Sequence, residues 1–75
     1  MTPPYGVILF HTTSAAMRAE KLLMSAAYDI KLIPTPREFS SDCSLAIRFL
    51  WQDKDRIDSL IESSKIEIVG INPLP

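Results

Sequence analysis

The sequence has few of the residues from which most active sites are built. It contains one cysteine, one histidine and two glycines among 75 residues. A single cysteine excludes a disulfide within the chain, and one cysteine with one histidine cannot supply the ligands of a zinc site. Two glycines are too few for a glycine-rich phosphate loop. The thiol and the imidazole could form a dyad, but no third orienting group is evident.

Excess charge and long apolar runs are also absent. Eight basic and nine acidic residues give a net charge of -1, which argues against a nucleic-acid or anionic-membrane binder that works by bulk charge. No apolar run reaches the roughly 20 residues that span a bilayer. Residues 1–4 lack the basic start of a signal peptide. We therefore expect a cytoplasmic protein with no cofactor and with neither nucleic acid nor membrane as a partner.

What the sequence does contain is enough for one small domain. An apolar fraction of 47% and a charged fraction of 23% are ordinary for a folded chain. A chain of this size buries roughly 60% of its surface on folding, which gives a thin core. We expect a single domain over residues 1–75, with an ordered core at about residues 5–71.

The hydrophobic pattern predicts an α+β fold with the order βαββαβ. Two right-handed βαβ crossovers with a hairpin between them give a ferredoxin-like sandwich, with an antiparallel sheet in the order 4-1-3-2 and both helices on one face. The residues 12–14 are good caps for the first helix, which should end near residues 28–29, and Asp53 is expected to cap the second. Strands are predicted at residues 7–10, 30–33, 45–50 and 66–69.

The pattern does not decide which side chains lie on the sheet face that the helices leave open. Either Val7 and Leu9 or their neighbours point away from the helices, and so does either the Leu45 set or the Ala46 set. An apolar open face on so small a monomer is a liability, so we expect association there, including a homo-oligomer. The alternative is an ordinary scatter of exposed apolar residues.

One edge of the predicted sheet gathers the reactive side chains. The third strand runs antiparallel to the first, so its start, near Cys43, lies beside the end of the first strand, near His11. A thiolate is stabilised by a helix N-terminus, by arginine and by protonated histidine. The residues expected to shape the loop are Pro34, Thr35 and Pro36. The residues expected to bind the thiolate or another anion are His11, Thr12, Thr13, Ser14, Arg37, Ser40 and Ser41.

Each of these residues also has a purely structural interpretation. A lone cysteine is most often a small buried hydrophobic side chain. His11 can be a capping side chain, and Arg37 a solvated loop residue or an anchor for the loop. Ser40 and Ser41 can form turns through hydrogen bonds to the backbone. The residues alone leave both interpretations open.

Several motifs resemble those of a known family of short bacterial proteins, the Se/S carrier protein-like family. They are FHTTSA at residues 10–15, EKLL at 20–23, PTPR at 34–37 and SSDC at 40–43. The resemblance covers roughly residues 5–70. It implies a carrier whose cysteine, here Cys43, holds sulfur or selenium as a persulfide or selenosulfide, with donor and acceptor proteins as partners. Ser44 stands where the family usually has a glycine, a residue that permits close approach of a backbone or ligand.

Two classes of function follow. In the first, Cys43 accepts sulfur from a donor's persulfide, and the lack of a second cysteine fits a carrier better than a dithiol oxidoreductase. In the second, the chain is a non-catalytic module that binds a partner or a small anion through its sheet or its loop edge. An enzyme with independent turnover ranks third. RNA binding ranks fourth, because the aromatic signature of RNA-binding sheets is absent from the first and third strands.

Overall fold

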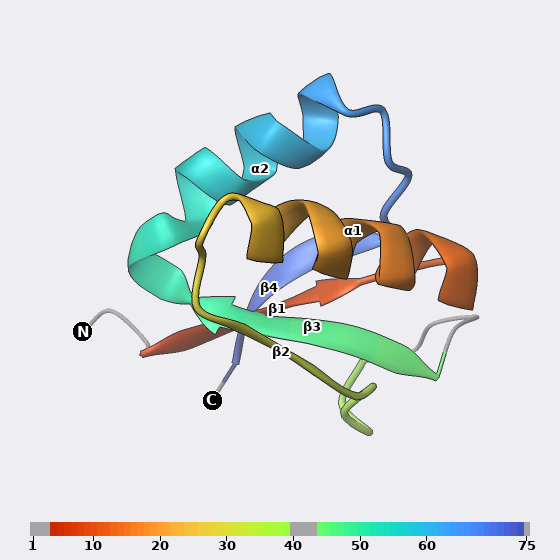
Figure 1. The fold of residues 1–75 in the computed structure, drawn as a ribbon. Coiled ribbons are helices and arrows are strands. Elements are labelled where there is room, and N and C mark those ends of the chain that lie inside the picture. Colours follow the sequence, from red (N-terminus) through yellow and green to blue (C-terminus); the bar gives the residue numbers. More distant parts are fainter. Residues whose placement is uncertain (1–3, 40–43, 75) are drawn as a thin grey trace.

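The computed structural model describes residues 4–39 and 44–74. The strands form one antiparallel sheet in the order β2-β3-β1-β4, and both helices cover the same face of it (Figure 1). The predicted ferredoxin-like α+β sandwich is therefore confirmed. The elements are β1 (Tyr5–Leu9), α1 (Thr13–Ser25), β2 (Ile30–Pro34), β3 (Leu45–Leu50), the 3-10 turn η1 (Trp51–Asp53), α2 (Lys54–Ser63) and β4 (Gly70–Leu74).

The strand register brings the end of β1 close to the start of β3. β1 lies in the middle of the sheet, and Leu9 at its end pairs with Ala46 of β3 and Gly70 of β4. α1 begins four residues after Leu9, at Thr13. The end of β1 and the start of β3 are therefore neighbours, as the antiparallel topology predicts.

The main core lies between the sheet and the helices, and it settles which side chains face the helices. Ile8 of β1 points towards the helices, and so does Phe10, which directly follows β1. Ile47 and Phe49 of β3 point the same way. Full burial of side chains of this size contributes roughly 1.5–3 kcal/mol each. The Val7 and Ala46 sets therefore lie on the opposite, open face. The helix residues buried in the main core are Ala16, Ala19, Leu23, Ile57 and Ile61.

Gly6 marks the tightest packing in the sheet. It pairs with Phe49 across the β1–β3 ladder, and the Phe49 and Trp51 rings stack with their centroids 6.1 Å apart. A Cβ atom at position 6 would lie 2.6 Å from the Trp51 ring and closer still to Phe49. The absence of a side chain at Gly6 is what lets both rings lie against the strand.

Each helix is followed, two residues after its last residue, by a non-glycine residue with a left-handed backbone. Ala27 has a φ of 66° after α1, and Lys65 has a φ of 58° after α2. Beyond Ala27, the Tyr28 N–H donates 3.0 Å to the Leu23 carbonyl, which is the long hydrogen bond of a Schellman motif. This motif ends α1 at Ser25, earlier than the residues 28–29 that the sequence suggests.

The predicted fourth strand at residues 66–69 is wrong, because β4 is Gly70–Leu74. Ile66 instead closes α2, where its N–H donates 3.3 Å to the Ile61 carbonyl and its side chain enters the main core. A β-branched residue is equally suited to either role, so β-propensity does not separate them. β4 also extends beyond residue 71 and includes Pro73, which an edge strand tolerates.

The two helix starts differ in how they are capped. At α1, Thr12 is the N-cap and its Oγ1 accepts a 3.1 Å hydrogen bond from the Ala15 N–H. At α2, Asp53 occupies the N-cap position but its side chain makes no capping hydrogen bond, which corrects the sequence prediction. Because η1 leads directly into α2, the Asp53 carboxylate acts on the helix only as a nearby negative charge.

Candidate functional site

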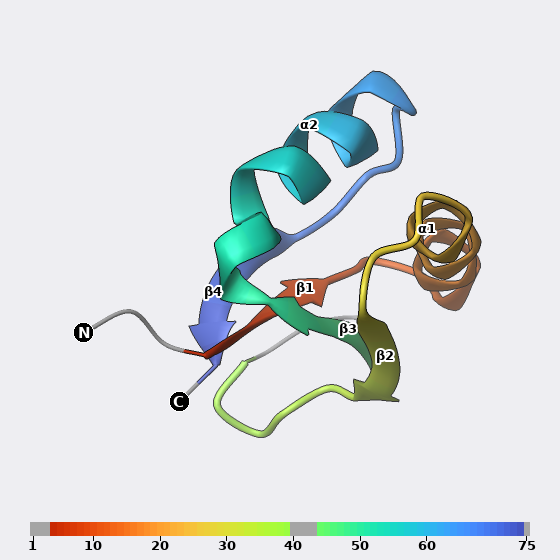
Figure 2. The same ribbon diagram turned by 60° about the vertical axis from the view of Figure 1, so that its left-hand side comes forward.

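The loop that follows β2 turns beneath the face of the sheet opposite the helices (Figure 2). The Phe39 N–H donates 3.0 Å to the Pro36 carbonyl, which makes residues 36–39 a tight turn. The Thr35 N–H donates 2.8 Å to the Ser44 carbonyl. The loop is thus closed at its base by Thr35 and Ser44, next to the last β2–β3 pair.

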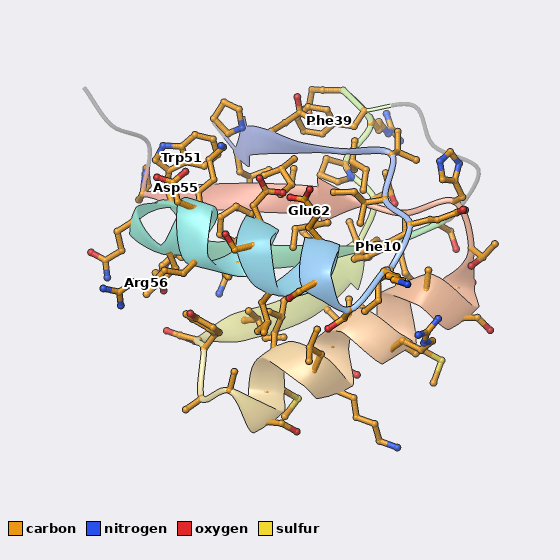
Figure 3. The ribbon with its side chains drawn as sticks, turned by 90° about the horizontal axis from the view of Figure 1, so that it is seen from above. Phe10, Phe39, Trp51, Asp55, Arg56 and Glu62 are labelled. Atoms are coloured by element: carbon orange, nitrogen blue, oxygen red, sulfur yellow. The ribbon has the colours of Figure 1, made fainter. Side chains whose placement is uncertain are left out.

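Phe39 packs against a second, smaller core on this open face. Seen from above, Phe39 lies beside β4, so the loop crosses beneath the sheet from β2 to the opposite edge (Figure 3). These apolar residues of the open face are therefore covered by side chains of the chain itself, and association through this face stays a prediction. The side chains buried on this face are Val7, Leu9 and Ala46, and Ile33, Phe39 and Leu74 pack against them.

A hollow of about 340 Å³ lies at the N-terminus of α1. Arg18 and Lys65 bring two positive charges to its lining, against one negative charge from Glu67. The N-terminal N–H groups of a helix add partial positive charge. The electrostatics of the hollow therefore favour a small anion. Its full lining is His11, Thr12, Ser14, Ala15, Arg18, Lys65 and Glu67.

The structure brings some of the predicted anion-binding residues together and separates others. His11, Thr12 and Ser14 share the hollow, whereas Thr13 does not line it. Arg37 is exposed in the 36–39 turn and does not line the hollow either. The predicted residues outside the described part of the chain are Ser40, Ser41 and Cys43.

Three residues of this region were not identified from the sequence. Arg18 follows Ser14 by four residues, which places both on one helix face, so the spacing was a usable signal. Lys65 reaches the hollow only because the segment that follows α2 runs beside the start of α1, and no local pattern encodes that. Phe39 was detectable as a lone aromatic residue inside a polar, proline-rich stretch.

The described part of the chain contains neither a metal-binding cluster nor a membrane-spanning helix. Within residues 4–39 and 44–74, His, Cys, Asp and Glu side chains form no cluster of three or more that could hold a metal ion. In the same ranges, no helix has both the length and the apolar character needed to cross a membrane.

These features define a two-layer α+β domain with an anion-favouring hollow at the N-terminus of its first helix. Residues 5–73 match the family described as "Putative Se/S carrier protein-like", and the chain belongs to this family. It is also similar to an uncharacterized protein of Methanocaldococcus jannaschii, with 39% identity over 62 residues.

The archaeal relative is much longer than the matched region. The match covers 83% of this chain but 31% of the relative, so the chain spans about a third of that protein's length. The relative comes from an archaeon, whereas the resemblance seen in the sequence implied bacterial proteins. No solved structure matches the chain.

Proposed function

We propose that the protein carries sulfur or selenium, with the transferred atom held on Cys43 as a persulfide or selenosulfide. Membership of the Se/S carrier protein-like family is the observation that carries this proposal. The chain's single cysteine supports it, because a carrier needs one thiol and no resolving partner. Donor and acceptor proteins are the partners that the role requires.

The proposed step is a sulfur exchange that needs no external oxidant or reductant. The Cys43 thiolate attacks the outer sulfur of a donor persulfide, and a new S–S bond forms on Cys43. The donor's own S–S bond breaks, and the donor leaves as a thiolate. The outer sulfur keeps its proton or its negative charge throughout. Attack on Cys43 persulfide by an acceptor thiolate completes the transfer.

In this proposal the hollow at the start of α1 stabilises negative charge on the carrier's thiolate or persulfide. Arg18 and Lys65 line the hollow with His11, and cations near a thiol favour its charged form. Other residues are proposed to stabilise the thiolate on the basis of the sequence alone. They are Thr13, Arg37, Ser40 and Ser41, together with the hydroxyl groups of Thr12 and Ser14.

Intact-protein mass spectrometry tests the carrier chemistry. After incubation with a cysteine desulfurase and cysteine, we expect an adduct of about 32 Da that dithiothreitol removes, as for any persulfide. A selenocysteine lyase with selenocysteine should give about 79 Da instead, which identifies the cargo. Cys43→Ser should give neither adduct. Failure to form an adduct on a thiol that iodoacetamide still alkylates would contradict the proposal.

The dependence of Cys43 alkylation on pH tests the role of the hollow. An apparent pKa below the value of about 8.5 for a free thiol would support a stabilised thiolate, and a value at or above it would support a structural cysteine. Arg18→Ala should raise the apparent pKa of Cys43. Lys21→Ala is the matched control, because Lys21 lies on the same helix but does not line the hollow.

The hollow also favours a second candidate, a non-catalytic module that binds a small anion. Its two cations and its helix N-terminus need no thiol to hold a phosphate or sulfate. In that case Cys43→Ser would leave biological activity intact, whereas Arg18→Ala would remove it. The carrier proposal expects the opposite result for Cys43→Ser.

A further inference from the structure

Two positive charges lie side by side on the open face of the sheet. Lys31 of β2 and Arg48 of β3 are direct partners in the strand register. Their neighbours Leu32 and Ile47 pack into the main core. Since side chains alternate along a strand, Lys31 and Arg48 point to the face away from both helices.

Arg48 is held in place by an aromatic ring rather than by a carboxylate. Its Cζ atom lies 4.4 Å from the centroid of the Tyr5 ring. Arg48 is half-buried and Lys31 is exposed. A guanidinium placed over a ring keeps its N–H donors for other partners, and these donors match the geometry of a carboxylate.

Neither cation is neutralised within the described part of the chain. The ion pair seen there joins Lys54 and Asp55 of α2, 3.8 Å apart, and Arg48 contacts the Tyr5 ring rather than a carboxylate. Like charges directly opposite each other on neighbouring strands destabilise a sheet. The chain has a net charge of -1. A general excess of basic residues therefore does not explain why these two cations lie side by side.

We propose that this part of the open face docks an acidic segment of a partner protein. Arg48 and Lys31 would pair with its carboxylates, and the Tyr5 ring, 36% exposed, would contact its apolar side chains. Charge complementarity supports this partner. The proposal does not depend on the carrier chemistry of Cys43.

Two other occupants fit this surface less well. A second copy of the chain would find the apolar part of the face already covered by Phe39. A two-fold contact through the rest would bring the Lys31 and Arg48 pairs of both copies towards each other. A nucleic acid strand would find two cations and one tyrosine, fewer charges and stacking rings than surfaces that bind single strands use.

NMR titration of the full ¹⁵N-labelled chain tests the proposal. The probe is a blocked peptide of alternating glutamate and alanine, and the same peptide with glutamine in place of glutamate is its control. We expect chemical-shift changes centred on Tyr5, Lys31 and Arg48 with the glutamate peptide and none with the glutamine peptide.

Lys31→Glu separates loss of binding from loss of folding. It places opposite charges across the strands, so it should raise the melting temperature while it weakens peptide binding by about tenfold or more. Lys21→Glu makes the same change of charge on α1 and should alter binding by less than about threefold. Equal losses in both variants would show attraction by bulk charge only and overturn the proposal.

Two further results would also overturn it. The first is an absence of shift changes at Tyr5, Lys31 and Arg48. The second is tighter binding of a short oligouridylate than of the glutamate peptide at this face, which would assign the surface to RNA.

Discussion

The backbone N–H of Thr35 donates a 2.8 Å hydrogen bond to the carbonyl of Ser44. This contact continues the β2–β3 ladder by one residue beyond the Pro34 and Leu45 pair. It fixes the base of the loop, and Phe39 fixes a second point by packing under the sheet. A loop tied at its base and at one internal residue has fewer conformations than a free loop of equal length.

Phe39→Ala should destabilise the fold by about 1–3 kcal/mol, because removal of the half-buried phenyl ring uncovers the smaller core on the open face. The ring packs on Val7, Leu9 and Ala46, so the variant should also bind more of a dye that reports exposed apolar surface. Urea unfolding measures the first effect. Phe39→Leu is the control and should retain most of the stability. An unchanged urea midpoint in Phe39→Ala would mean that the smaller core contributes nothing.

Gly6→Ala should destabilise the fold by about 1–3 kcal/mol through overpacking. The added methyl group would meet the rings of Phe49 and Trp51. Gly70→Ala is the matched control, because its nearest neighbour would be the Asn72 side chain at 3.9 Å. Thermal unfolding of both variants measures the difference. Equal melting temperatures would show that the two rings shift at no cost.

Ala27→Gly should stabilise the protein by about 1 kcal/mol, because glycine has no Cβ penalty in the left-handed region. Ala27 has a φ of 66°. In a domain of this size such a gain raises the melting temperature by roughly 4–8 °C. Ala26→Gly, one residue earlier at a φ of -85°, should instead lower it. A decrease in both variants would contradict the assignment of the Schellman motif.

Thr12→Ala should cost about 1 kcal/mol, the usual value of an N-cap oxygen. It removes the acceptor for the Ala15 N–H at the start of α1. Thr12→Ser keeps that oxygen and should stay close to the native stability in the same denaturation experiment. If the alanine variant matches the serine variant, the capping bond carries no stability.

Local hydrophobic periodicity was sufficient to predict the helices and strands that bury one face and expose the other. The alternation in β3 and the helical spacing of Ala19 and Leu23 identified both elements, because burial of one face fixes the residue pattern. The run at residues 66–69 was misassigned, since Ile66 is buried through a helix cap rather than through a strand. A backbone hydrogen bond of that kind leaves no trace in hydrophobic periodicity.

The candidate site was predictable only where its residues are close in sequence. His11, Thr12 and Ser14 surround one helix start, and helix-capping preferences locate that start. Lys65 joins them because the segment after α2 runs beside the start of α1, which no spacing reveals. The course of the loop depends on where Phe39 finds apolar surface, and that surface exists only once β1 and β3 have paired.

Prolines stand on both edges of the sheet. Pro34 ends β2 and Pro73 lies in β4, and these are the two outer strands. Proline offers no N–H group, so neither edge presents an unbroken row of donors to a strand from another chain. The sheet is thereby protected against growth into larger β-structured aggregates at high protein concentration. A partner that adds a strand to this sheet would therefore meet an interrupted row of donors at either edge.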